Sequence, residues 1–114
     1  MEGTRAPRLT VRDVVRGSEH TLILSGELDL GSRPLLDEAL RNVALEPTAA
    51  LVLDLSDVTF MDSTGLHAVL AAKERCAERG CRFLLVRGST QVQRLFELSG
   101  VLDELPFRPS AEAA

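Results

Sequence analysis

The sequence predicts a single small α/β domain with a mixed, mostly parallel sheet of four to five strands, an N-terminal antiparallel hairpin and three to four helices. Its 114 residues suit one domain, and 45% hydrophobic with 26% charged residues is an ordinary globular composition. Short apolar runs alternate with amphipathic runs in the order strand, strand, helix, strand, helix, strand, helix. This order is typical of parallel strands joined by right-handed crossovers.

The first two strands are expected to form the hairpin. Residues 9–16 alternate apolar and polar side chains, which indicates a strand with one solvated face. Gly17 and Ser18 supply a turn, and residues 21–25 form the second strand. Residues 26–31 interrupt the apolar pattern, so we expect the strand to end before them.

A helix is expected to follow this interruption. Ser32 is suited to cap the helix, Pro34 is tolerated in its first turn, and Pro47 stops it. Apolar side chains recur at helical spacing and predict one buried face, made of Leu35, Leu36, Ala39, Leu40 and Val43.

A strand and a second helix come next. Residues 49–55 are apolar except for Asp54, so we expect a strand that is covered on both faces, as in a parallel sheet. Residues 62–65 then turn the chain into a helix that ends near Arg79, with Gly80 as its C-terminal glycine. Its inward side chains are predicted to be Leu66, Val69, Leu70 and Ala77, with Lys73 at the rim.

The last part of the domain repeats this pattern. Residues 81–86 form a short apolar strand, and residues 88–90 lead into a third helix that carries Val92, Leu95 and Phe96 and is closed by Gly100. A final apolar patch, residues 102–107, fits either a helical turn or an edge strand. The folded domain is expected to span residues 9–107, between flexible tails at 1–8 and 108–114.

Composition excludes several classes of function. A net charge of −4, without Trp or Tyr, gives no basic or aromatic surface for nucleic acid. No apolar run approaches the ~20 residues that span a bilayer, and no signal-peptide core is apparent, so we expect a cytoplasmic protein without membrane insertion. Cys76 and Cys81 lie five residues apart without further ligands at metal spacing, which indicates reduced thiols and no metal or cofactor.

The most informative segment is the corner from Phe60 to Leu66, where an apolar strand gives way to an amphipathic helix. Ser63 is expected at the N-terminus of this helix, where unpaired N–H groups and the helix dipole favour negative charge. A phosphate on Ser63 would therefore be tolerated locally and would change the surface offered to a partner. The same residues also suit an ordinary helix start, in which Ser or Thr caps the helix and Asp62 complements the dipole.

An enzyme interpretation of this corner is less consistent with the sequence. Asp62, Ser63 and His67 lie close together, but Asp62 is adjacent to Ser63 and poorly placed to orient His67 from behind. The G-x-S-x-G elbow of serine hydrolases is also missing. We therefore expect no catalytic residues and no enzymatic activity.

A second polar segment, Gly26-Glu27-Leu28-Asp29, follows the second strand. Functional loops of open α/β sheets gather at the carboxyl ends of parallel strands. If the second and third strands are neighbours, Asp29 and Ser63 share one end of the domain. A structural alternative is that Glu27 and Asp29 simply form a polar loop with an Asx-type turn.

Three motifs together give the chain a family resemblance. They are G-E-L-D at residues 26–29, L-D-L-S at 53–56 and F-M-D-S-T-G-L at 60–66. With these motifs the chain resembles the STAS domain proteins, specifically the stand-alone bacterial anti-sigma factor antagonists, from about residue 9 to residue 107. The resemblance implies the STAS fold and a role in sigma factor regulation.

The resemblance also implies a partner-switching mechanism. Ser63 would be phosphorylated by a partner that is both anti-sigma factor and ATP-dependent serine kinase. The unphosphorylated protein would bind this kinase and free a sigma factor, and a serine phosphatase would reset the phosphorylated form. The partner-binding residues implied are Asp29, Asp62, Ser63, Thr64, Gly65 and His67, with repulsion of the phosphate by Asp62 and Asp29 driving release.

Two points stay open at this level. A STAS-type accessory subunit of a transporter or other assembly, not phosphorylated, is the alternative function, and a weak homodimer is compatible with either. His67 stands where many relatives have glycine, and a titratable side chain beside the docking surface would bear on the choice of partner.

Overall fold

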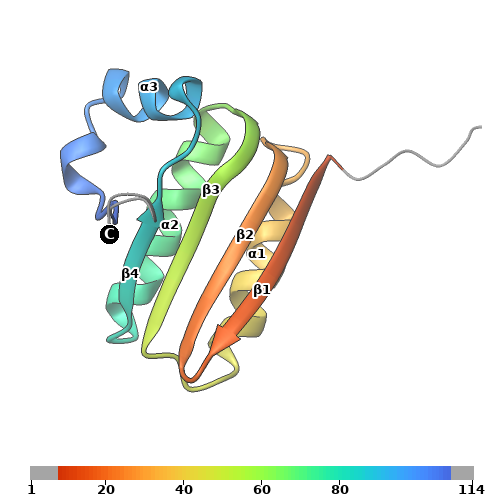
Figure 1. The fold of residues 1–114 in the computed structure, drawn as a ribbon, viewed down its shortest axis with the longest axis vertical. Helices are drawn as coiled ribbons and strands as arrows, with labels where there is room; N and C mark the ends of the chain where they lie inside the picture. Colours follow the sequence, from red (N-terminus) through yellow and green to blue (C-terminus); the bar gives the residue numbers. More distant parts are fainter. Residues whose placement is uncertain (1–7, 109–114) are drawn as a thin grey trace, which may run out of the picture.

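The computed structural model describes residues 8–108, which form a four-stranded sheet of order β1-β2-β3-β4 (Figure 1). β1 (Leu9–Arg16) pairs antiparallel with β2 (Glu19–Leu28), whereas β3 (Ala50–Met61) pairs parallel with β2 and with β4 (Arg82–Val86). The predicted mixed sheet with an N-terminal hairpin is confirmed. Most of the two predicted tails, residues 1–7 and 109–114, lies outside the described residues.

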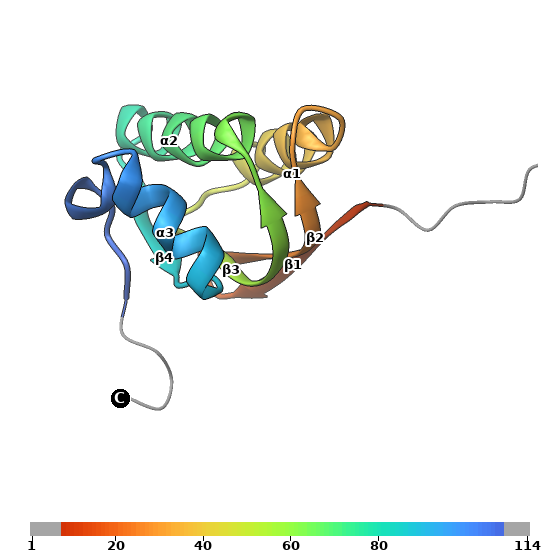
Figure 2. The same ribbon diagram turned by 90° about the horizontal axis from the view of Figure 1, so that it is seen from above.

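Two helices, α1 (Arg33–Ala44) and α2 (Ser63–Glu78), pack side by side on one face of the sheet (Figure 2). Alternate strand residues turn inward and are fully buried against these helices, among them Leu22, Leu24, Leu53 and Leu55. The third strand is covered on both faces over residues 50–53, as predicted, although α1 and α2 pack on one face only (Figure 2). Val52 is nevertheless buried, because it lies between Thr21 and Leu84 of the neighbouring strands.

The strands β2 and β3 are longer than predicted. β2 continues to Leu28 and β3 to Met61, and the two remain paired at Leu28↔Met61 beyond irregularities on either side of Gly26. Polar residues and glycine made both segments look like loops. Pairing with a neighbouring strand satisfies the backbone of such segments, so the tertiary context overrides local composition.

The helices follow the predicted order with local differences. Leu36, Leu40 and Val43 are buried as predicted, but Leu35 is 44% exposed because it lies at the side of the buried stripe. α1 ends at Ala44, before Pro47, and Ala77 of α2 is exposed rather than inward. In α2 the predicted C-terminal glycine, Gly80, is confirmed by its left-handed backbone.

The C-terminal segment packs α3 (Thr90–Leu98) against the core through Phe96. The apolar patch that follows combines both structures considered for it. Leu102–Glu104 is a 3-10 turn, and Phe107 then forms an isolated parallel bridge with Leu85. The bridge connects this segment to β4, and the rings of Phe96 and Phe107, which meet edge to face at 5.7 Å between centroids, connect it to α3.

Two kinds of feature are absent from residues 8–108. No helix in this part of the chain is long and apolar enough to cross a membrane. The described residues also contain no cluster of three or more potential metal ligands. Cys76 is buried and Cys81 half-buried, and both are free thiols, as predicted.

The start of the described chain contacts the C-terminal end of β2 closely. The N–H of Glu27 donates to the carbonyl of Arg8 at 2.7 Å. Gly26, with φ of 110°, lies so close to Arg8 that a Cβ atom would collide with that carbonyl oxygen. Gly17 also has a positive φ, of 61°, but open space surrounds it.

We predict that Gly26→Ala destabilises the domain far more than Gly17→Ala. Gly17→Ala should lower the free energy of unfolding by about 1 kcal/mol, the cost of a left-handed alanine. Gly26→Ala adds a backbone collision and should cost about 3 kcal/mol or more. Urea unfolding of both variants measures the difference, and equal losses would contradict the proposed close approach of residues 8 and 26.

Candidate functional site

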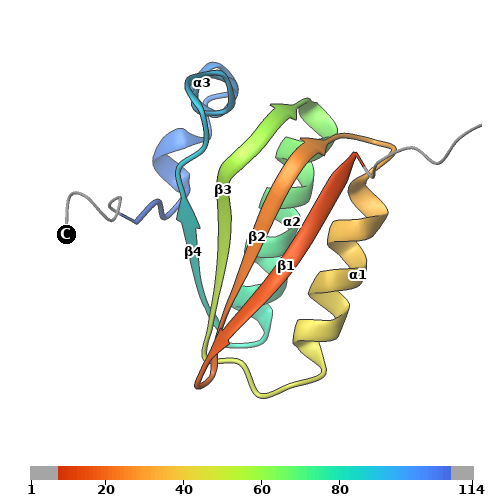
Figure 3. The same cartoon turned by 45° about the vertical axis from the view of Figure 1, so that its right-hand side comes forward.

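The parallel pairing of β2 and β3 brings two loops to one edge of the domain. Because Leu28 pairs with Met61, the chain leaves both strands at the same level, as Figure 3 shows at the upper end of the sheet. Asp29 and Ser63 were expected to share one end of the domain if the second and third strands are neighbours. β2 and β3 are neighbours, so this expectation is confirmed.

Ser63 is the first residue of α2 and is exposed. The cap of this helix is Asp62, which has an extended backbone and whose carboxylate accepts a hydrogen bond from the N–H of Gly65 at 3.2 Å. Within residues 8–108 the Ser63 hydroxyl has no hydrogen-bond partner. Asp62 therefore caps the helix, and the serine hydroxyl stays accessible to a partner.

The backbone around Ser63 favours an added negative charge. The first regular helical hydrogen bond of α2 runs from the N–H of Leu66 to the carbonyl of Asp62 at 3.0 Å. The N–H groups of Ser63 and Thr64 precede this bond and point out of the helix end. Together with the helix dipole, they lower the free-energy cost of placing a negative charge on the serine.

Gly65 holds the start of α2 against the sheet. It is buried, and a Cβ atom on it would lie 2.6 Å from the carbonyl oxygen of Leu28 and 2.6 Å from Cγ of Met61. Only glycine permits this approach, so the position of the neighbouring Ser63 relative to the end of β2 depends on it.

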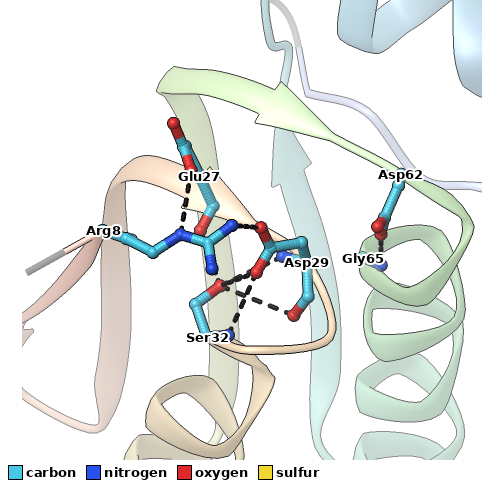
Figure 4. Close-up of polar contacts among 6 residues, drawn as sticks. All are labelled: Arg8, Glu27, Asp29, Ser32, Asp62 and Gly65. Atoms are coloured by element: carbon cyan, nitrogen blue, oxygen red, sulfur yellow. Dashed lines mark hydrogen bonds and ion pairs between the residues drawn. The ribbon is translucent and has the colours of Figure 1, made fainter.

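Asp29 lies in a closed polar network rather than on the surface (Figure 4). It is 6% exposed, and its Oδ1 accepts from the N–H of Ser32 at 3.1 Å while its own N–H donates to Ser32 Oγ at 3.0 Å. Its Oδ2 forms an ion pair with Arg8, whose Nε also donates to Glu27 at 3.0 Å. The Asx-type loop considered for this segment is thus present, with an added ion pair.

This network corrects two expectations from the sequence. Ser32 occupies the N-cap position of α1 but makes no capping hydrogen bond, because its Oγ accepts from the N–H of Asp29 at 3.0 Å and donates to the carbonyl of Glu27 at 2.6 Å instead. Arg8, assigned to a flexible tail, is anchored to the domain. The hairpin register could have indicated this contact, since Leu9 pairs with Gly26 and so places Arg8 beside Glu27.

The pKa of Asp29 reflects two opposing effects. Burial alone would raise it, but the hydrogen bonds from Ser32 and the positive charge of Arg8 outweigh burial and hold the pKa below its ordinary value. The carboxylate is therefore charged in the folded protein and bound to Arg8 at neutral pH.

The exposed part of this edge, termed the Ser63 surface, combines apolar and polar side chains. Leu30, at the tip of the Asp29 loop, is 75% exposed. Phe60 precedes Ser63 by three residues, is 49% exposed and borders a groove with Leu95 and Leu98 of α3. Ser63 and His67 are exposed on α2, and Asp62 and Thr64 are partly exposed. Sequence reasoning found the polar members but missed Leu30 and Phe60, because an apolar residue is not recognisable as exposed before the fold is known.

Comparison with known proteins places the chain in a family. The sequence model of the STAS domain matches residues 10–114. The anti-sigma-B factor antagonist of Listeria monocytogenes is 33% identical over 94 residues, which are 82% of each chain.

Solved structures agree with this relationship. The crystal structure of an anti-sigma factor antagonist from Mycobacterium paratuberculosis superposes with a TM-score of 0.82 at 28% identity, over 96% of this chain and 94% of that one. SpoIIAA, an anti-sigma factor antagonist solved in its unphosphorylated form, has a TM-score of 0.72 at 21% identity, over 92% and 91% of the two chains. SpoIIAA has also been solved in its phosphorylated form.

We predict that the Asp29 network makes stability depend on pH in the acid range. A carboxyl whose pKa is lowered by folding stabilises the domain above its ordinary pKa, 3.8, and loses this contribution as pH falls through the lower folded value. The difference in unfolding free energy between the native chain and Asp29→Asn should therefore narrow below that pH. Urea titrations at a series of pH values measure it.

Two arginine variants provide the matched comparison for this prediction. Arg8→Gln should reduce the effect of Asp29→Asn on the free energy of unfolding at neutral pH, because it removes the cation that pairs with Asp29. Arg12→Gln, on an exposed position of β1, should leave it unchanged. If the free energies of unfolding of the native chain and Asp29→Asn differ by the same amount at every pH, the charge of the Asp29 carboxylate does not stabilise the fold.

Proposed function

This chain belongs to the STAS domain family and groups with its anti-sigma factor antagonists, and we propose that it is a partner switch controlled by phosphorylation of Ser63. Unphosphorylated, it binds an anti-sigma factor that is also a serine kinase, and a sigma factor is freed. Phosphorylation ends this complex, and a serine phosphatase restores the binding form. The observation that carries the proposal is the exposed Ser63 hydroxyl at the helix N-terminus, which has no hydrogen-bond partner within residues 8–108.

The charge change is large enough to act as a switch. A phosphate adds about −1.5 to −2 charges at neutral pH, directly beside Asp62. Moving a complex from nearly all bound to nearly all free takes on the order of 5 kcal/mol of differential affinity. Burying a doubly charged group beside a carboxylate in a protein interface supplies a penalty of this size, whereas in the free protein water and the helix N-terminus keep the cost low.

The members of the Ser63 surface have different parts in this proposal. Leu30 and Phe60 supply apolar contact, worth about 1 to 3 kcal/mol each when a partner buries them fully. Thr64 and His67 contribute polar contacts beside the phosphorylated residue. Asp29 and Gly65 are buried and support the surface. Asp29 holds the loop that carries Leu30, and Gly65 sets the position of α2.

The phosphorylation switch predicts a defined result for single variants. With a cognate anti-sigma factor kinase and ATP, intact-mass analysis should show the gain of one phosphate that maps to Ser63. Ser63→Ala should bind the kinase with native affinity and stay bound when ATP is added, since it cannot acquire the charge. Ser99→Ala, at an exposed serine that follows α3, is the control, and it should be phosphorylated and released as the native chain is.

Two outcomes would contradict the switch. Release of Ser63→Ala by ATP would mean that another residue carries the charge change. Stable binding of a partner assembly without any phosphate incorporation would favour the accessory-subunit function instead.

Leu30 provides an independent test of where the partner binds. Leu30→Ser should weaken kinase binding about tenfold, because it removes apolar contact area from the Ser63 surface. Leu45→Ser is the matched control, since Leu45 is 83% exposed at the opposite end of α1. Equal effects of both variants in a binding titration would place the partner elsewhere.

A further inference from the structure

The end of the domain away from Ser63 contains an apolar cavity. It lies where the C-terminal ends of α1 and α2 pass over the start of β3, at the lower end of the sheet in Figure 3. Its volume is about 350 Å³, which falls in the range of small-molecule sites. The apolar side chains of Leu40, Val43, Leu51 and Ala72 line it, and the two cysteines close one side.

The rim of this cavity is basic in an otherwise acidic chain. Arg41, Arg75 and Arg79 border it with Glu78 as the one acidic group, so the rim carries a net charge of +2, that is, three positive groups less one negative. The chain as a whole has a net charge of −4. Arginines in the last turn of a helix complement its dipole, but this role does not require an open apolar cavity beneath them.

Two of the three guanidinium groups are available to a ligand. Arg79 donates from Nη2 to the carbonyl of Ala44 at 2.8 Å and so connects the ends of the two helices. Within residues 8–108, the guanidinium groups of Arg41 and Arg75 have no hydrogen bond or ion pair. They border the cavity from α1 and α2 respectively.

We propose that this cavity binds a small anionic amphiphile, with its carboxylate between Arg41 and Arg75 and its apolar tail on Leu51. Guanidinium groups bind carboxylates through paired, charge-assisted hydrogen bonds, and the lining below offers an apolar environment to a short chain. At roughly 30 Å³ per water-sized atom, the cavity holds on the order of ten non-hydrogen atoms, the size of octanoate.

The site is separate from the Ser63 surface. Cys76, in the wall of the cavity, lies thirteen residues after Ser63 on the same helix, which is ~20 Å along its axis. Binding of the amphiphile therefore needs neither the kinase nor phosphorylation, and its test can fail or succeed independently of the proposed switch.

The test titrates the full chain with octanoate, octan-1-ol and octylamine, followed by amide chemical shifts. Octanoate should bind about tenfold more tightly than octan-1-ol, and octylamine should bind weakest, because the rim repels it. The double variant Arg41→Gln, Arg75→Gln should lower octanoate affinity to that of octan-1-ol. Arg12→Gln, far from the cavity on β1, should leave it at the native value.

Labelling of Cys81 locates the bound molecule. Cys76 is a poor target, because burial and its neighbour Cys81 raise the pKa of its thiol to about 12. Cys81 is half-buried in the cavity wall, and saturating octanoate should slow its reaction with a maleimide several-fold. Octylamine at the same concentration should leave the rate unchanged.

A variant that fills the cavity completes the test. Ala44→Phe should remove octanoate binding, whereas Ala77→Phe, on the exposed side of α2, should preserve it. If Ala44→Phe does not fold, the arginine double variant and the labelling rates decide alone. Equal affinity for octanoate and octylamine, native binding by the arginine double variant, or unprotected Cys81 would each overturn the proposal.

Discussion

The parallel pairing of β2 with β3, maintained to their last residues, is the constraint on which the candidate site depends. It places the Asp29 loop and the start of α2 at one edge, and Gly65 then lets the helix approach the carbonyl of Leu28 closely. Strands that ended at residues 25 and 55, as the sequence suggests, would not carry the chain to this common edge. The same pairing therefore determines both the extent of the sheet and the geometry of the Ser63 surface.

Within this frame, polar groups divide into those that support the site and those that are presented by it. The Asp29 carboxylate accepts a hydrogen bond from Ser32 and pairs with Arg8, and the Asp62 carboxylate accepts a hydrogen bond from the N–H of Gly65. The Ser63 hydroxyl remains available on the surface. A site arranged in this way is pre-formed, because its supporting hydrogen bonds are closed before any partner arrives.

The order of elements could be predicted from the sequence, because alternation in β1 and helical spacing in α2 are local patterns. The full length of β2 could not, since residues 26–28 gain their strand structure by pairing with β3 and, at Gly26, also with Leu9 of β1. Ser63 was recognisable from the strand-to-helix corner and from a family motif. Arg8 and Leu30 were not, because an ion pair or an exposed apolar side chain depends on what lies across the fold.

The position of Asp29 also changes the electrostatic argument for the switch. From the sequence, repulsion by both Asp62 and Asp29 was expected to act on a phosphate at Ser63. In the fold, Arg8 pairs with both Asp29 and Glu27, so it offsets one of the two negative charges on that side and reduces the repulsion from Asp29. The helix N-terminus lowers the cost further. Most of the differential free energy must then come from the partner, through desolvation of the phosphate and its own charges. A rigid domain is sufficient for such a switch, since neither state requires the sheet or helices to rearrange.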